Sequence, residues 1–152
     1  MSKQQLVIKE KKIFSQFGED GVIESIFATI GTTNKFFVEF GVGKDGTECN
    51  TKLLLNNGWS GIQMDQESIL PYIKREKIDA SNVEQIFKKY NVPKEFDFLS
   101  IDIDGNDYWV WKTITNYDPR VVCIEYNSIT DNSRDKTVKY DPQNSWSGKD
   151  DY

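Results

Sequence analysis

The feature that most constrains the fold of this chain is a strand-forming run that leads directly into three spaced glycines. The β-branched and aromatic run 36–40 predicts a buried strand, and Gly41, Gly43 and Gly46 follow it at the spacing G-x-G-x-x-G. Because glycine has no Cβ, these positions allow a tight turn and let the backbone approach a ligand closely. A helix expected at 47–57 would then point its first N–H groups at that ligand. The pattern predicts a nucleotide-binding β-α-β unit.

Two acidic residues beside the glycine turn indicate which nucleotide the unit binds. Asp65 follows the turn by about 20 residues, as an acid does in dinucleotide-binding units. Glu39 lies two residues before Gly41, where hydride-transfer domains normally carry an apolar residue. A carboxylate there can accept a hydrogen bond from the cationic amino-acid end of a ligand, which suits S-adenosylmethionine. The alternative is that Glu39 is a solvated acid at the mouth of the turn.

Composition and charge place the chain among soluble globular proteins. Its 152 residues are 38% hydrophobic and 28% charged, which suits one domain with a single core. The expected domain spans 1–152, with an N-terminal arm at 1–13 and an irregular tail at 128–152. We expect that tail to be either partly disordered or packed by Tyr140 and Trp146.

The net charge of −5 argues against a nucleic-acid partner, which would need clustered lysines and arginines. No apolar run approaches the ~20 residues of a membrane span, and no signal peptide opens the sequence. We therefore expect a cytoplasmic protein without a membrane partner. Cys49 and Cys123 are expected to be thiols in a reducing compartment, not a disulfide or a metal pair.

The chain has no histidine, and this restricts its chemistry. A Ser-His-Asp or Cys-His nucleophile system is excluded, and a conventional zinc site is disfavoured. A general base must then be a carboxylate, a tyrosine, a lysine or a metal-bound group.

Strands and helices alternate along the chain, which predicts parallel β-α-β units. The expected fold class is α/β, a Rossmann-like three-layer sandwich with a mostly parallel sheet of about five strands. The third strand is reduced, because only the short run 77–80 stands where that strand should lie. Ser81 and Glu84 have the spacing of a capping box. Helices are expected at 19–30, 47–57, 68–77, 82–90 and 106–115, and the other strands at 36–40, 61–65, 96–102 and 121–126.

Acidic residues gather at the carboxyl end of the predicted strand 96–102. Alternation along this strand places Asp102 and Asp104 on one face, about 6.5 Å apart. Glu125 ends the next strand at the same edge of the sheet, where open α/β sheets bind ligands. The three carboxylates are a candidate site for Mg²⁺ or another divalent cation, and Asp102 or Asp104 is the candidate catalytic base. Alternatively, Asp104 and Asp107 cap the helix that follows.

Taken in order, these segments resemble the FkbM-type methyltransferases, a branch of the class I enzymes that depend on S-adenosylmethionine. The resemblance covers about 14–127 and rests on several short segments in the right order, each moderately specific by itself. The segments are Ser15–Asp20, Val38–Gly43, Asn50–Thr51, Asn57–Gly61, Ser100–Gly105 and Val122–Glu125.

The resemblance implies a Rossmann-like sheet that binds S-adenosylmethionine. Glu39, Gly41 and Gly43 would lie near the methionine end of this cofactor, and Asp102 is a further candidate contact. Asp65 would match the acid that holds the ribose hydroxyls. Enzymes of this kind methylate hydroxyl groups, often on sugars or natural products.

Two departures from the family pattern affect what the resemblance implies. The stretch between Asp65 and Ser81 is shorter than usual, which compresses the third strand and part of the adenine wall. The sequence also stops after the fifth strand, whereas the class normally adds a sixth strand and an antiparallel seventh. The substrate-binding parts are then either lost or supplied by a second copy of the chain, which is an expected partner beside a small-molecule substrate.

The leading interpretation is a methyltransferase that moves the methyl group of S-adenosylmethionine to a hydroxyl oxygen of a small molecule or sugar. Such a displacement requires positioning and a route by which the hydroxyl proton leaves. A second interpretation is a catalytically reduced cofactor-binding or interaction module of the same fold. A third is an NAD-binding oxidoreductase, which the glycine spacing favours and Glu39 opposes.

Overall fold

The computed structural model describes residues 6–47, 49–126 and 137–143. In these residues the strands form one five-stranded sheet in the order β3-β2-β1-β4-β5, and each neighbouring pair is parallel. This architecture confirms the predicted α/β fold with its parallel sheet. The strands are β1 (Phe36–Phe40), β2 (Ser60–Asp65), β3 (Lys74–Arg75), β4 (Glu95–Ile101) and β5 (Asp118–Ile124).

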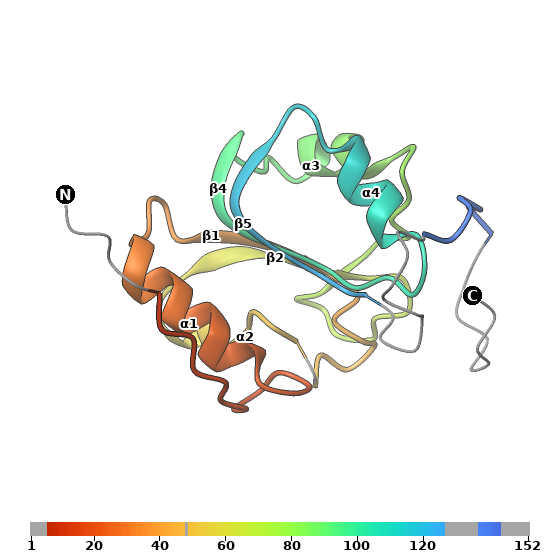
Figure 1. The fold of residues 1–152 in the computed structure, drawn as a ribbon. Helices are drawn as coiled ribbons and strands as arrows, with labels where there is room; N and C mark the ends of the chain where they lie inside the picture. Colours follow the sequence, from red (N-terminus) through yellow and green to blue (C-terminus); the bar gives the residue numbers. More distant parts are fainter. Residues whose placement is uncertain (1–5, 48, 127–136, 144–152) are drawn as a thin grey trace.

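Helices cover both faces of this sheet. Those in the described ranges are α1 (Glu19–Ile30), α2 (Lys52–Asn56), α3 (Val83–Lys89) and α4 (Asp107–Thr113). Helices α1 and α2 lie on one face, and α3 and α4 lie on the other, so the sheet is the middle of three layers (Figure 1). Within the described ranges, each helix is too short or too polar to span a bilayer.

Alternation along the central strands fills a core on each face of the sheet. Phe37 and Phe98 face α1 and α2, where Phe27 and Trp59 join them with their rings 4.9 Å apart, edge to face. The larger core lies under α3 and α4. It contains Val38, Phe40, Met64, Phe87, Leu99, Ile101 and Val110.

The segment between β2 and α3 differs most from the sequence-based prediction. The sequence predicts a helix at 68–77, and this is wrong: these residues form turns and the two-residue strand β3. Arg75 pairs with Asp65 at the edge of the sheet, and Pro71 has no N–H to donate to a helix. The reduced third strand is confirmed, although it lies just before the expected run 77–80.

The start of α3 also differs, because both side chains of the predicted capping box have other partners. Oγ of Ser81 donates to the carboxylate of Asp79 at 2.6 Å, and α3 has no side-chain cap at its N-terminus. Glu84 accepts the backbone N–H groups of Thr115 and Asn116, each at 2.7 Å. Glu84 therefore connects α3 to the residues that follow α4.

The described part of the predicted tail, 137–143, is irregular and packs against α4. Nε1 of Trp109 donates to the carbonyl of Val138 at 2.8 Å, and the ring of Tyr140 lies 6.3 Å from that of Trp109. The predicted packing by Tyr140 is thus confirmed. Trp146 lies outside the described residues.

Candidate functional site

A cavity of about 400 Å³ opens at the carboxyl ends of the strands, where the sheet order reverses between β1 and β4. Open parallel sheets bind ligands at this point, and small-molecule sites typically measure roughly 300–1,000 Å³. The lining includes Gly43 from the turn after β1 and Asp65 from the end of β2. Asp102 and Asp104 line it from the segment after β4. The structure therefore brings these predicted site residues together.

Gly41 and Gly43 follow β1, and the structure requires the absence of a side chain at these two positions for different reasons. Gly41 has a φ of 74°, and a Cβ there would lie 1.5 Å from the carbonyl oxygen of Asp102. The sequence assigns this space to a ligand, but the backbone after β4 occupies it. Gly43 has a φ of 71°, and a Cβ there would lie 3.9 Å from Oδ1 of Asp45, in otherwise open space. Gly41 thus allows the backbone segments that follow β1 and β4 to lie in close contact, and Gly43 leaves the turn open beside the cavity.

Glu39 is buried with its carboxylate against the loop before α2. It accepts the backbone N–H of Asn50 at 2.6 Å and that of Thr51 at 3.2 Å, and it also accepts the hydroxyl of Thr51. Burial raises the pKa of Glu39 to about 7 despite these hydrogen bonds. The alternative of a solvated acid is wrong, because Glu39 is 3% exposed. The carboxylate of Glu39 thus connects this loop to β1, which is a different role from the predicted contact with a cationic ligand.

This attachment also explains why α2 is shorter than the helix predicted at 47–57. Residues 50 and 51 direct their N–H groups to Glu39, and α2 begins only at Lys52. The helix then runs to Asn56.

Asp65 ends β2 and lines the cavity while half-buried. Its Oδ1 accepts the backbone N–H of Glu67 at 2.7 Å, which holds the turn after β2 against the carboxylate. This location agrees with the contact to ribose hydroxyls that the family resemblance implies. The contact itself stays a prediction.

The three acidic residues predicted to converge do so. One carboxylate oxygen from each of Asp102, Asp104 and Glu125 lies within 4.8 Å of the others. The local geometry differs from the predicted strand, because β4 ends at Ile101 and Asp104 has a φ of 58° in the loop that follows. Glu125 follows β5 and donates its backbone N–H to Ile101 at 2.9 Å, which holds the two strand ends together.

Asp107 holds the loop that carries Asp104. Its Oδ1 accepts the N–H of Ile103 at 2.8 Å, and its Oδ2 accepts the N–H of Gly105 at 2.9 Å. The alternative that Asp104 and Asp107 cap α4 is wrong, because Asn106 stands at the N-cap and no side chain caps this end of the helix. Asp107 instead supports the loop from the first turn of α4.

Burial and mutual repulsion raise the pKa values of this acidic cluster. Partial burial, and then the charges of Asp107 and Asp104, raise the pKa of Asp102 to about 6. Burial and the charges of Asp107 and Asp65 raise the pKa of Asp104. Burial and the charge of Asp102 raise the pKa of Glu125 to about 8, and the two side chains share a hydrogen bond. A shared proton relieves the repulsion here, and a divalent cation would also do so.

One wall of the cavity comes from 137–143, a segment for which the sequence gives no site signal. Pro142 lines the cavity, and its carbonyl accepts a hydrogen bond from Nζ of Lys77 at 3.1 Å. Nδ2 of Asn106 donates to the carbonyl of Asp141 at 2.7 Å. These bonds join residues far apart in the chain, so local patterns do not reveal them.

A family model described as the methyltransferase FkbM domain matches residues 23–141, which is most of the chain. The chain belongs to the FkbM methyltransferase family. The matched FkbM domain runs from within α1 to the wall at 137–143, so it spans the glycine turn, Asp65 and the acidic cluster. The resemblance stated from the sequence is thereby confirmed. Among the curated proteins and the solved structures compared with this FkbM chain, nothing matches.

Proposed function

We propose that this FkbM-family methyltransferase moves a methyl group from S-adenosylmethionine to a hydroxyl oxygen of a small molecule or sugar. The observation that carries the proposal is the charge of the cavity at the carboxyl ends of the strands. Such an acidic lining favours a cationic ligand and disfavours the pyrophosphate of a dinucleotide such as NAD. The lining has six carboxylate side chains and two lysines: Asp65, Glu67, Glu76, Asp79, Asp102 and Asp104, with Lys44 and Lys77.

Other lining residues suit the remaining parts of this donor. Asp65 would accept hydrogen bonds from the ribose hydroxyls, and the open turn at Gly43 leaves room beside the backbone. Ile78 and Ile103 give the cavity apolar surface that suits an adenine ring. When bound, S-adenosylmethionine supplies a methyl group on a positively charged sulfur.

Asp102 is the residue that we assign to the hydroxyl proton of the acceptor. Its pKa of about 6 makes it a stronger base than an ordinary aspartate and still leaves it mostly ionised at neutral pH. The hydrogen bond with Glu125 orients its carboxyl group. The cluster of Asp102, Asp104 and Glu125 would also suit Mg²⁺, which prefers carboxylate oxygens and lowers the pKa of a bound hydroxyl.

Calorimetric titration with S-adenosylmethionine, S-adenosylhomocysteine and NAD tests the donor. We expect the two adenosyl compounds to bind and Asp65→Ala to weaken both by at least roughly tenfold, because a charge-assisted hydrogen bond contributes ~1.5–3 kcal/mol. Asp118→Ala is the matched control, because it removes an exposed acid at the opposite edge of the sheet. Preferential binding of NAD, or an unchanged affinity in Asp65→Ala, would overturn the assignment.

Turnover then separates an active enzyme from a reduced module that keeps only donor binding. We expect hydroxyl-bearing sugars or small molecules to stimulate release of S-adenosylhomocysteine, and Asp102→Asn to lower kcat. A protein that binds the donor but turns over none of a broad panel of hydroxyl acceptors would support the reduced module.

A further inference from the structure

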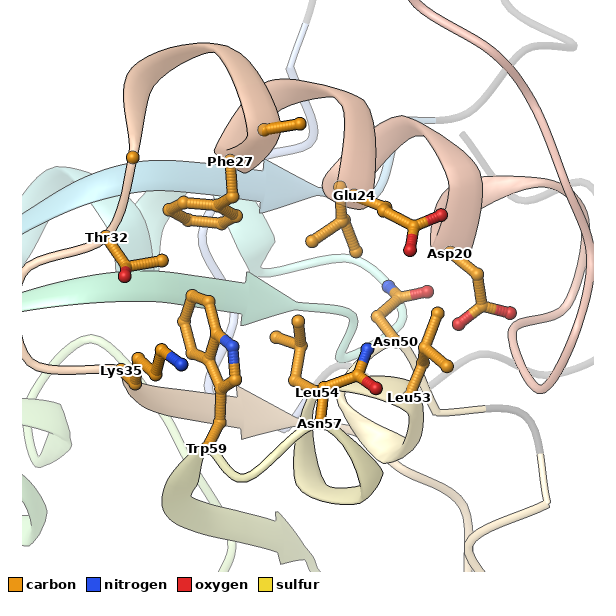
Figure 2. Close-up of a pocket in the computed structure, with 13 residues that line it drawn as sticks. Asp20, Glu24, Phe27, Thr32, Lys35, Asn50, Leu53, Leu54, Asn57 and Trp59 are labelled. Carbon is orange, nitrogen blue, oxygen red and sulfur yellow. The ribbon is translucent and has the colours of Figure 1, made fainter.

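A second cavity, of about 340 Å³, lies between α1 and α2 on the face of the sheet that these helices cover (Figure 2). Its lining residues differ from those of the cavity at the strand ends. One of them, Asp20, also lies before the range that the family model matches. This cavity therefore needs an explanation of its own.

One end of the second cavity holds a buried carboxylate with an unused oxygen. Asp20 is 1% exposed, and its Oδ2 accepts the N–H groups of Ile13, Phe14 and Ser15 at 2.6–2.8 Å. Burial raises the pKa of Asp20, but these hydrogen bonds outweigh it and hold the pKa below its usual value. Oδ1 has no hydrogen-bond partner among the residues that the structure describes. A ligand that donates to this charged oxygen would remove a cost of folding.

Two further acceptors lie at the same end. Figure 2 shows the carboxylate of Glu24 and the amide of Asn50 on the Asp20 side of the cavity. Nδ2 of Asn50 donates to Oγ of Ser100 at 3.0 Å and lies 3.9 Å from Sγ of Cys123. These contacts hold the amide of Asn50 in place through its nitrogen and leave its oxygen as an acceptor for a ligand. This end of the cavity thus offers acceptors of negative or partly negative charge.

The rest of the lining is largely apolar. Phe27 and Trp59 meet edge to face at 4.9 Å, and Leu53 and Leu54 from the α2 side complete this surface. Lys35 lies at the opposite end from Asp20 (Figure 2). A ligand that fits has a cationic donor at one end and an apolar or aromatic body beside it.

We propose that this cavity is a second small-molecule site whose ligand is a primary amine with an apolar or aromatic body. An ammonium group has three donors and no acceptor, which complements Asp20, Glu24 and Asn50. A bare metal ion would leave the apolar lining without a role. A neutral apolar molecule would leave Oδ1 of Asp20 without a donor.

Three probes of equal body and different charge test the site by NMR titration of the whole chain. They are 2-phenylethylamine, neutral 2-phenylethanol and anionic 3-phenylpropionate. We expect the amine to shift the indole N–H signal of Trp59 and the amide signals of residues 13–15. It should bind at least roughly tenfold more tightly than the alcohol, because its ammonium makes charge-assisted hydrogen bonds. Equal binding of amine and alcohol, or unmoved signals at millimolar amine, would overturn the proposal.

Substitutions of the lining residues test whether 2-phenylethylamine binds in this cavity. Ala28→Trp fills the cavity from its exposed rim on α1 and should abolish binding of 2-phenylethylamine. Asp20→Asn should weaken it by roughly tenfold. Because Asp20 also holds residues 13–15, Glu24→Gln gives a milder test on an exposed residue, with an expected loss of about two- to fivefold.

Glu95→Gln removes an exposed acid at the start of β4 and is the charge control. In Ala28→Trp, affinity for S-adenosylmethionine should stay unchanged, so failure of this proposal is distinguishable from failure of the donor assignment. Wild-type affinity for the amine in Ala28→Trp would overturn the proposal.

Discussion

The two edges of the sheet, at the amino ends and the carboxyl ends of its strands, surround aspartate with opposite kinds of groups. Strand β4 has one example near each end. Asp97, near its start, is fully buried and surrounded by donors. Nη1 of Arg120 donates at 2.7 Å, and the backbone N–H groups of Thr33 and Lys35 donate at 2.8 Å. Burial raises the pKa of Asp97, but the hydrogen bonds from Arg120, Lys35 and Thr33 hold it below its usual value. Arg120 also donates to carbonyl groups at the end of α1, so this ion pair joins three segments.

Asp102, just beyond the other end of β4, has carboxylates for neighbours. Burial raises its pKa as well, and the charges of Asp107 and Asp104 raise it further, to about 6. Burial alone therefore does not decide whether an acid is charged, because the surrounding donors and acceptors add to its effect or oppose it. An edge rich in donors stabilises the fold, whereas an edge rich in acceptors stays available to a ligand, a proton or a cation.

Asp97→Ala gives the largest expected effect and is the most direct way to break this comparison. Asp97→Ala leaves the backbone N–H groups of Thr33 and Lys35, and the more exposed guanidinium of Arg120, without their acceptor. Each donor left unsatisfied inside the protein costs about 1–3 kcal/mol, so we expect a total loss of about 3–5 kcal/mol. Chemical denaturation should show this loss, and Asp118→Ala should change the free energy of unfolding by less than about 0.5 kcal/mol. If Asp97→Ala were as stable as Asp118→Ala, the donor-rich edge would not be what stabilises the sheet.

Glu39 sharpens the comparison, because it has several donors and its pKa is nevertheless raised to about 7 by burial. A folded-state pKa above the usual 4.5 means that Glu39 stabilises the fold at low pH. This contribution is lost as pH rises from 4.5 through 7, by roughly 3 kcal/mol at most. Denaturation at pH 5 and pH 8 should therefore show a smaller loss of stability for Glu39→Gln than for the wild type. Equal losses would mean that Glu39 is ionised in the folded protein at both values.

Asp104→Asn has the smallest expected effect. It should raise the free energy of unfolding, whereas Asp97→Ala should lower it. Removing one charge from the cluster relieves repulsion, and asparagine tolerates the left-handed φ at this position. Because Asp104 is exposed, the expected gain in the free energy of unfolding is below about 1 kcal/mol. A loss of stability in this variant would contradict repulsion within the cluster.

The same variant also tests whether the cluster binds a cation. Millimolar Mg²⁺ or Mn²⁺ should raise the Tm of the wild type by mass action, and raise it less in Asp104→Asn. Wild-type melting curves that coincide with and without EDTA would rule the cation out.

The fold was largely predictable because its main elements rest on local patterns. Helix α1 follows from apolar residues at helical spacing, and β1 follows from its β-branched and aromatic run. The segment 68–77 was not predictable in the same way, because pairing of Arg75 with Asp65 decides its structure. Glu39 comes two residues after Phe37 in β1, so both side chains point to the same face of the sheet. This alternation could have indicated from the sequence that the carboxylate faces α1 and α2.

The site was predictable where strand ends alone position its residues. Asp65 and Asp102 lie at or just beyond the carboxyl ends of parallel strands, so topology brings them to one edge. The wall at 137–143 and the unused oxygen of Asp20 depend on contacts that no periodicity encodes. Asp97 and Arg120, 23 positions apart, likewise form their ion pair only once β4 and β5 are aligned.

The close contact between Gly41 and the backbone of Asp102 limits how this protein can be re-engineered. Since a Cβ there would lie 1.5 Å from the carbonyl oxygen of Asp102, the turn that borders the proposed donor and the segment that carries the proposed base cannot be redesigned separately. A library that varies Gly41 would alter both at once. Selection for a new acceptor has more freedom in the wall 137–143, which lies outside this close contact. In this chain, acceptor choice could therefore change through the wall while the glycine turn and the proposed base stay as they are.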